Sequence, residues 1–130
     1  MQVRLDFGPD FHGSMKNSHG DELKLGRDPG EFKPYELLPT AMGSCFYVTF
    51  LGIAEKQKLE FTGASLEISG EHREEVPTTL KEVQLIFSIH GADKEQEKKF
   101  QRAAELAGKY CSIYQTIGSV AEMTLEVKLD

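Results

Sequence analysis

The sequence predicts an α+β fold with the element order βββ-α-ββ-α-β. Short runs with an apolar residue at every second position lie at the start, in the middle and at the end of the chain, as half-buried strands require. Two segments of helical character separate these runs, an uncharged one at residues 37–54 and an amphipathic one at residues 93–111. Because strands and helices come in groups instead of alternating one by one, α+β is favoured over α/β.

The first third of the chain is predicted to be a meander of three short antiparallel strands. Turn-forming residues at 8–10 and 18–21 divide it into three extended stretches. The alternating apolar positions of these stretches are Val3, Leu5, Phe7, Leu23 and Leu25.

The uncharged segment predicts a central helix that is buried on several faces. Pro34 suits a first helical turn, but Pro39 inside a helix would remove a hydrogen bond and clash with the preceding turn, at a cost of roughly 3 kcal/mol. We therefore expect the regular helix to begin near Pro39 and to end near Lys58. Small side chains on one face suit close packing against a second helix, which favours a homodimer. This face carries Leu38, Ala41, Cys45, Thr49 and Gly52.

The second half of the chain predicts two longer strands, a helix, one short helical turn and a final strand. Asp93 is a good N-cap for the helix, and the short turn at residues 112–118 ends in a glycine. Alternation identifies the strands through Ala64, Leu66 and Ile68, through Val83, Leu85, Phe87 and Ile89, and through Ala121, Met123, Leu125, Val127 and Leu129. Helical spacing identifies the buried stripe as Phe100, Ala103, Ala104, Ala107 and Cys111.

Composition limits the class of protein. The net charge of −6 and the scattered basic residues argue against a nucleic-acid partner. Residues 37–54 approach the length that crosses a bilayer, but the proline and glycines among them favour a buried helix of a soluble domain. The first residues lack the apolar run of a signal peptide. We therefore expect a single domain over residues 1–130, in the cytoplasm, with no membrane partner.

The cysteines are the remaining candidates for chemistry. The glycines lack the spacing of a phosphate-binding loop, and the four histidines lack the paired spacing of metal ligands, so we expect no cofactor and no metal. A permanent structural disulfide is disfavoured in the reducing cytosol. From the residues alone, Cys45 and Cys111 are either a redox pair or two small buried apolar side chains.

Two segments around the cysteines resemble the two signatures of one known family. Residues 34–45 read Pro-Tyr-Glu-Leu-Leu-Pro-Thr-Ala-Met-Gly-Ser-Cys, and residues 109–113 read Lys-Tyr-Cys-Ser-Ile. The first is similar to the central-helix signature of the OsmC/Ohr family of osmotically inducible and organic-hydroperoxide-resistance proteins. The second is similar to that family's signature at the end of its last long helix. The interval between the cysteines and the element order are also typical of the family, and the resemblance covers essentially the whole chain.

The resemblance implies an intertwined homodimer with active sites at the subunit interface and without a metal or organic cofactor. It implies that Cys45 is the peroxidatic thiolate, which attacks the O–O bond of an organic hydroperoxide. Cys111 would then condense with the Cys45 sulfenic acid to a disulfide, which an external dithiol reduces. Glu36 matches the family glutamate that orients an activating arginine; from the residues alone it is equally a carboxylate of the first helical turn. The implied function is a thiol-dependent peroxidase in the oxidative stress response, and an alkyl substrate is favoured by the nearby aromatic residues Phe46, Tyr47 and Phe50.

The chain departs from the family pattern in two places. The peroxidase branches carry the activating arginine near residues 11–13, where this chain has none. Arg27 and Lys33 are cations that could replace it from their loop. Pro39 lies where family helices carry an apolar or small residue. The alternative function is therefore a non-enzymatic OsmC-like dimer that binds a small apolar ligand and whose thiols are unreactive.

Overall fold

The computed structural model describes residues 1–130 as two compact units, Met1–Thr40 and Ala41–Asp130. The single domain expected over residues 1–130 stays a prediction. Both units contain a small sheet, and three α-helices complete the mixed α+β fold that the sequence predicts.

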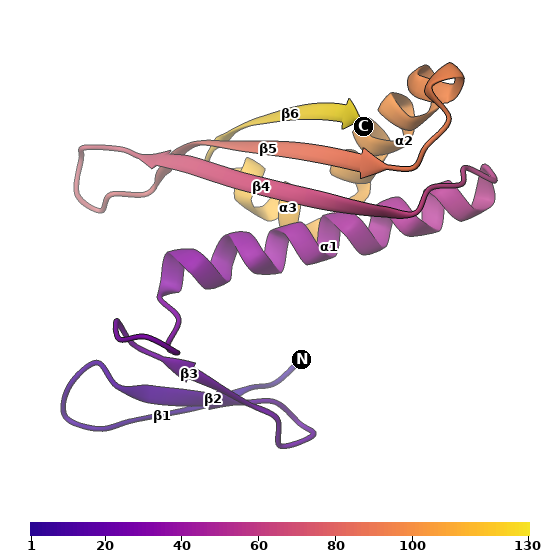
Figure 1. Cartoon of the computed structure of the whole chain (residues 1–130). Coiled ribbons are helices and arrows are strands. Elements are labelled where there is room, and N and C mark those ends of the chain that lie inside the picture. The colour runs from indigo at the N-terminus through magenta and orange to yellow at the C-terminus, as the bar shows by residue number, and fades with distance from the viewer. The chain divides into compact units, whose positions relative to one another are not determined.

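The first unit holds the predicted antiparallel meander. Its strands are β1 (Arg4–Phe7), β2 (Gly13–Lys16) and β3 (Glu22–Leu25), in the spatial order β1-β2-β3 (Figure 1). Phe7 lies opposite Gly13, and a Cβ added at Gly13 would come within 2.4 Å of the Phe7 ring. This pairing therefore requires glycine at position 13.

The central helix α1 spans Pro34–Lys56, so the expected start near Pro39 is wrong. The backbone amide of Lys33 donates to the Glu36 carboxylate at 2.9 Å, and the Lys33 carbonyl accepts from the amide of Glu36 at 3.0 Å. These bonds cap the helix just before Pro34, where the missing N–H of a proline costs nothing. Pro39 then removes only one internal donor, a loss that the capped first turn tolerates.

By length and composition alone, α1 is a helix that could cross a membrane. The core helix of a globular protein passes the same test. Three large side chains of α1, Met42, Phe46 and Phe50, are fully buried within the second unit.

The second unit is built on the sheet β4-β5-β6, whose strands are β4 (Gly63–His72), β5 (Leu80–His90) and β6 (Glu122–Leu129). β4 pairs with β5 in antiparallel fashion and β5 pairs with β6 in parallel. Between β5 and β6 the chain forms the 3₁₀ turn η1 (Lys94–Gln96), α2 (Glu97–Tyr110) and α3 (Ser112–Gly118). Asp93 is an N-cap as predicted, but it caps η1, with its carboxylate accepting from the Glu95 amide at 3.0 Å.

Aromatic rings of α1 and β5 form the centre of the core. Phe87 meets Phe46 and Phe50 edge to face, with ring centroids 5.2 and 4.8 Å apart, a favourable arrangement of ring quadrupoles. The predicted stripe of α2 is confirmed, because all five of its members are fully buried. The predicted alternation of the last strand is also confirmed, since its apolar residues from Met123 to Leu129 turn toward this core. The sheet and helices of the second unit therefore enclose one continuous apolar core.

Candidate thiol site

Cys45 lies on α1 at the boundary between the core and the surface. Its side chain is half-buried and packs against the core of the second unit. The Thr49 hydroxyl donates to the Cys45 carbonyl at 2.8 Å, one turn further along the helix. The residue is thus held on a helix and stays partly exposed to solvent.

Cys111 joins α2 to α3. Its backbone is extended, with φ −76° and ψ 115°, so the helix ends here and a new one begins. The Cys111 amide donates to the Ala107 carbonyl at 2.8 Å and closes α2, while its sulfur accepts from the Tyr114 amide at 3.4 Å and caps α3. The side chain is fully buried. Cys111 is therefore both the last cap of one helix and the first cap of the next.

The junction around Cys111 is held firmly. Gly108 has no side chain, and the Tyr114 ring lies 3.4 Å from the place that a Cβ would occupy. The Gln115 side-chain amide donates to the Gly108 carbonyl at 3.0 Å, which ties α3 to α2. Small residues in α2 thus let α3 fold back closely, and the first amides of α3 take fixed positions.

The structure brings the two predicted cysteines together. Both are free thiols, and they form a side-chain hydrogen bond with each other. The pKa of Cys45 is lowered, first by a hydrogen bond from the backbone amide of Ile113, then by the Cys111 thiol and by Ser112. The pKa of Cys111 is raised, first by burial and then by the neighbouring Cys45. Because a thiolate is the reactive form of cysteine, these opposite pKa shifts make Cys45 the better candidate for a nucleophile of the two thiols.

The amide of Ile113 is a functional group that the sequence analysis missed. Backbone amides have no residue signature, but the predicted helical turn at residues 112–118 was an indirect signal. The first amides of such a turn have no partner inside the helix and can donate to an anion. In this chain they donate to the sulfur of Cys45.

Glu36 belongs to the first unit, and its carboxylate caps the start of its own helix through the Lys33 amide. This is the first-turn role that the sequence left open, and an orienting role of Glu36 stays a prediction. Of the candidate replacement cations, Arg27 lies over the Phe11 ring at 5.0 Å, a cation–π contact. Phe11, Arg27 and Lys33 line a pocket of about 420 Å³ together with Pro34 and Tyr35, all within the first unit.

The three aromatic residues that follow Cys45 differ in how deeply they are buried. Phe46 and Phe50 are fully buried against Phe87. Tyr47 is half-buried, with its ring 6.3 Å from Phe87. Cys111 belongs to the same buried cluster as Phe46 and Phe50, and the expectation that these three rings favour an alkyl substrate stays a prediction.

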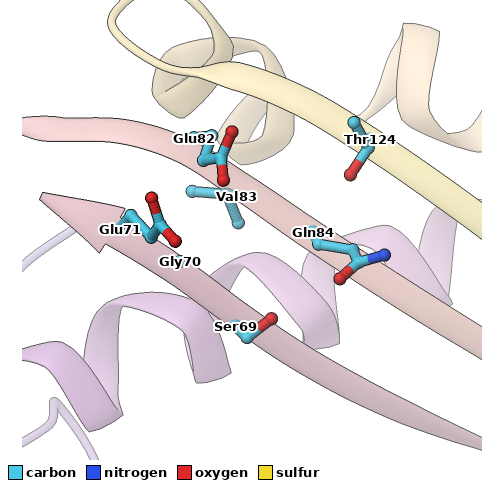
Figure 2. Close-up of a pocket in the computed structure, with 7 residues that line it drawn as sticks. All are labelled: Ser69, Gly70, Glu71, Glu82, Val83, Gln84 and Thr124. Atoms are coloured by element: carbon cyan, nitrogen blue, oxygen red, sulfur yellow. The ribbon is translucent and has the colours of Figure 1, made fainter.

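The outer face of the second sheet carries a polar hollow of about 380 Å³. Figure 2 shows Glu71 and Glu82 on adjacent strands at one end of it, with Gln84 and Thr124 at the other. Glu71 is directly opposite Glu82 in the strand register, so two carboxylates of like charge face each other. None of the residues that line the hollow is a cysteine or a histidine.

A Ser65–His90–Asp130 row lies at the end of the same sheet. Ser65 Oγ is 3.0 Å from His90 Nε2, and His90 Nδ1 contacts the Asp130 carboxylate. The side chains of His90 and Asp130 are 39% and 60% exposed, so water competes for their bonds. The Asp130 amide also donates to the Ile89 carbonyl at 3.1 Å. We interpret these contacts as structural, because they attach Asp130 to the end of the sheet.

The fold and the thiol site together define a class of protein. Its members are α+β chains with one partly exposed thiol on a central helix and a second, buried thiol where two later helices meet. The OsmC-like protein family matches residues 26–126, so the chain belongs to this family.

Individual relatives support the same fold. The protein YhfA of Escherichia coli is 26% identical over 129 residues, which are 95% of this chain and 94% of that protein. The OsmC-like protein of Mycoplasma pneumoniae has a TM-score of 0.84 at 18% identity, covering 98% of this chain and 95% of its own. The organic hydroperoxide resistance protein OhrB of Bacillus subtilis has a TM-score of 0.73 at 18% identity, covering 98% of this chain and 96% of its own.

Proposed function

We propose that this protein is a cytoplasmic thiol-dependent peroxidase that reduces organic hydroperoxides in the oxidative stress response. The observation that supports this most is the pairing of an accessible Cys45, whose pKa is lowered by the Ile113 amide, with the buried Cys111 thiol. A low pKa, partial exposure and a resolving thiol in contact are the properties of a redox-active cysteine. The family and the hydroperoxide resistance proteins among its structural neighbours agree with this proposal.

The reaction proceeds in two steps. The Cys45 thiolate attacks one oxygen of the hydroperoxide ROOH, so that an S–O bond forms, the O–O bond breaks, and RO⁻ leaves and takes up a proton as the alcohol. Cys111 then attacks the Cys45 sulfenic acid; an S–S bond forms and water leaves. The two thiols lose two electrons in total, and the peroxide gains them. An external dithiol returns the disulfide to two thiols.

The Ile113 and Ser112 donors take over part of the task for which the family uses an arginine. An arginine stabilises a thiolate by its charge, whereas the first amides of a helix do so by directed hydrogen bonds. Both donors come from the segment that carries the resolving Cys111. Activation of Cys45 therefore needs no cation in this proposal.

We also propose that the protein works as a homodimer. Two apolar side chains of α1 in the second unit stay open to solvent: Val48 is 62% exposed and Leu51 is 39% exposed. Gly52, next to Leu51 on α1, has no side chain, and nothing lies within 4 Å of the place that a Cβ would occupy there. An apolar helix surface with room for close approach suits a second copy of the chain.

The test is hydroperoxide consumption by the reduced protein with cumene hydroperoxide and an excess of a dithiol. We expect catalytic turnover by the wild type and a loss of at least about 100-fold in Cys45→Ser, since a hydroxyl is a far weaker nucleophile at neutral pH. Cys111→Ser should keep its fold, because serine is a favourable N-cap, but it should turn over more slowly, since the external dithiol must then reduce the Cys45 sulfenic acid directly, and no intramolecular disulfide should form. Ser44→Ala, an exposed neighbour on the same helix, is the matched control and should be fully active.

Two results together would contradict the peroxidase proposal. The wild type would consume hydroperoxide no faster than Cys45→Ser, and mass spectrometry would find no Cys45–Cys111 disulfide. The second candidate function, a dimer that binds a small apolar ligand without turnover, would then be favoured. The pocket of about 420 Å³ beside Phe11 and Arg27 supports this second candidate. The ligand-binding function predicts that an apolar fluorescent probe binds the reduced protein and that Phe11→Ala weakens this binding.

A further inference from the structure

The last turn of α2 leaves backbone carbonyls without their usual helical partners. The Cys111 amide still donates to the Ala107 carbonyl at 2.8 Å. Beyond this bond the helical ladder of α2 ends, because the backbone of Cys111 is extended, with ψ 115°. The Gly108 carbonyl is the next one along the chain, and Gly108 is buried. A buried carbonyl without a partner is unfavourable, so the Gly108 carbonyl needs a donor from outside α2.

Gln115 of α3 supplies that donor. Its side-chain amide donates to the Gly108 carbonyl at 3.0 Å, in a partly buried bond that reaches back over 7 residues. The backbone amide of Gln115 donates to the Cys111 carbonyl at 3.0 Å and so closes the first turn of α3. One residue therefore completes the first turn of α3 and also ties that turn to the end of α2.

The same turn of α3 carries a donor of the thiol site. Ile113 lies between Cys111 and Gln115, and its backbone amide donates to the sulfur of Cys45. The helices α1 and α2 are both held by the core of the second unit. The position of the Ile113 amide relative to the Cys45 sulfur therefore depends on how α3 is held against α2.

Apolar contacts also hold α3 in place. Tyr114 packs over Gly108, and Ile117 is buried in the core. Such contacts are not directional, so they permit small rotations of a short helix. The side-chain bond of Gln115 restricts both distance and angle. The bond to the thiol sulfur depends on its angle in the same way, so a rotation of α3 would weaken it.

We propose that Gln115 is a positioning residue of the thiol site. Its bond to the Gly108 carbonyl sets the direction in which the Ile113 amide meets the Cys45 sulfur. Gln115 makes no hydrogen bond to either sulfur, so it acts through the backbone of α3. This role rests on the proposed function, in which the ionised Cys45 is the nucleophile.

Alkylation of Cys45 by iodoacetamide across a range of pH tests this role in the full-length protein. Mass spectrometry of the peptide that contains Cys45 gives the rate at each pH. Gln115→Met removes the amide at an exposed position and keeps a good helix former there, so the variant should fold. We expect the pKa of Cys45 to rise and alkylation below this pKa to slow about two- to fivefold, because a misdirected hydrogen bond stabilises the thiolate less. The plateau rate at high pH should not fall, since the thiol is then fully ionised.

Gln101→Met is the matched control. The Gln101 side-chain amide donates to the Glu105 carboxylate at 3.2 Å within α2, so this variant loses the same group without loosening α3. Its pH profile should coincide with that of the wild type. Amide hydrogen exchange gives a second readout. Exchange at Ile113 should be at least about threefold faster in Gln115→Met, while exchange at the Cys111 amide, which closes α2, should not change.

Three results would overturn the role of Gln115. One is a pH profile of Gln115→Met that coincides with that of the wild type. Another is faster alkylation of this variant at every pH, because loosened packing exposes Cys45 without raising its pKa. The third is an equal shift of the profile in Gln101→Met. None of these readouts uses a hydroperoxide. Absence of hydroperoxide consumption would therefore contradict the proposed function alone, and these alkylation results would contradict the role of Gln115 alone.

Discussion

The two units of this chain differ in what stabilises them. Ala41–Asp130 encloses a core of aromatic and aliphatic side chains, many of them fully inaccessible to solvent. In Met1–Thr40, Leu25 is the one buried apolar residue, and every residue of β1 is exposed. Three short strands without a covered face bury too little apolar surface to offset the entropy of ordering them.

This difference also appears in how each unit positions its reactive or charged groups. The thiols and the amides that activate Cys45 lie on helices that are anchored in the core of the second unit. The charged groups around His12, which include Asp28 and Glu31, lie on loops of the first unit, and hydrogen bonds between side chains and backbone position them. The geometry of the thiols thus depends on the packing of a large core, whereas the geometry of the charges around His12 depends on hydrogen bonds within loops.

The largest expected effect follows from the contrast between Phe87 and Phe7. Phe87→Ala leaves a cavity at the centre of the core and should lower the free energy of unfolding by about 3–5 kcal/mol. Phe7 is 49% exposed, so Phe7→Ala should cost less than about 1 kcal/mol. Urea denaturation followed by circular dichroism measures both. Equal losses of unfolding free energy in the two variants would mean that Phe7 is covered in solution. The two units would then not differ in how much apolar surface they bury.

The second prediction concerns the open surface of α1. Val48→Glu places a charge in the surface that we assign to the homodimer, and it should weaken dimerisation at least about tenfold. Val76→Glu introduces the same charge at a loop valine that is 92% exposed and should leave the dimer intact. Sedimentation velocity over a range of protein concentrations gives both results. A wild type that is monomeric at all concentrations would exclude the dimer.

The smallest effect tests whether the second unit activates its own thiol. Ser112→Pro removes the Ser112 amide and hydroxyl from Cys45 but suits the first position of α3, and Ser112→Ala removes the hydroxyl alone. The pKa of Cys45 should rise in both variants, and more in the proline variant. Alkylation by iodoacetamide at pH 7 should slow up to about tenfold in Ser112→Pro, since a hydrogen bond to a charged group is worth about 1.5 kcal/mol.

The pH dependence of alkylation provides the control for this comparison. The rate rises with pH as the thiolate forms and levels off above the pKa. Because the pKa of Cys45 is lowered, the wild type should reach its plateau at a lower pH than a free cysteine does, and the variants should reach it later. Identical profiles for the wild type and Ser112→Pro would contradict activation by the start of α3.

Periodicity in the sequence predicted most of the fold, because it reports which side chains turn toward a core. The alternation from Met123 to Leu129 and the stripe ending at Cys111 are direct examples. The start of α1 was predicted wrongly because the Glu36 side chain supplies the cap before Pro34, a local contact that outweighs the helix-breaking tendency of Pro39.

The site was less accessible to sequence reasoning. Periodicity placed Cys45 and Cys111 on separate helices and left open whether they are a redox pair or two core residues; the family resemblance paired them. The donor from Ile113 is a backbone amide, which any residue except proline provides, so no residue type marks it. The cluster around His12 depends on how two loops fold back on each other, and spacing along the chain does not encode that geometry.

The helix junction at Cys111 also has a consequence for redox poise. The Ile113 amide stabilises a negatively charged sulfur, whereas a sulfur joined in a disulfide carries no charge and gains much less from that bond. The same amide therefore stabilises the dithiol state relative to a Cys45–Cys111 disulfide and raises the reduction potential of the pair. The arrangement that makes Cys45 reactive toward an oxidant thus makes its oxidised form easy for a dithiol to reduce.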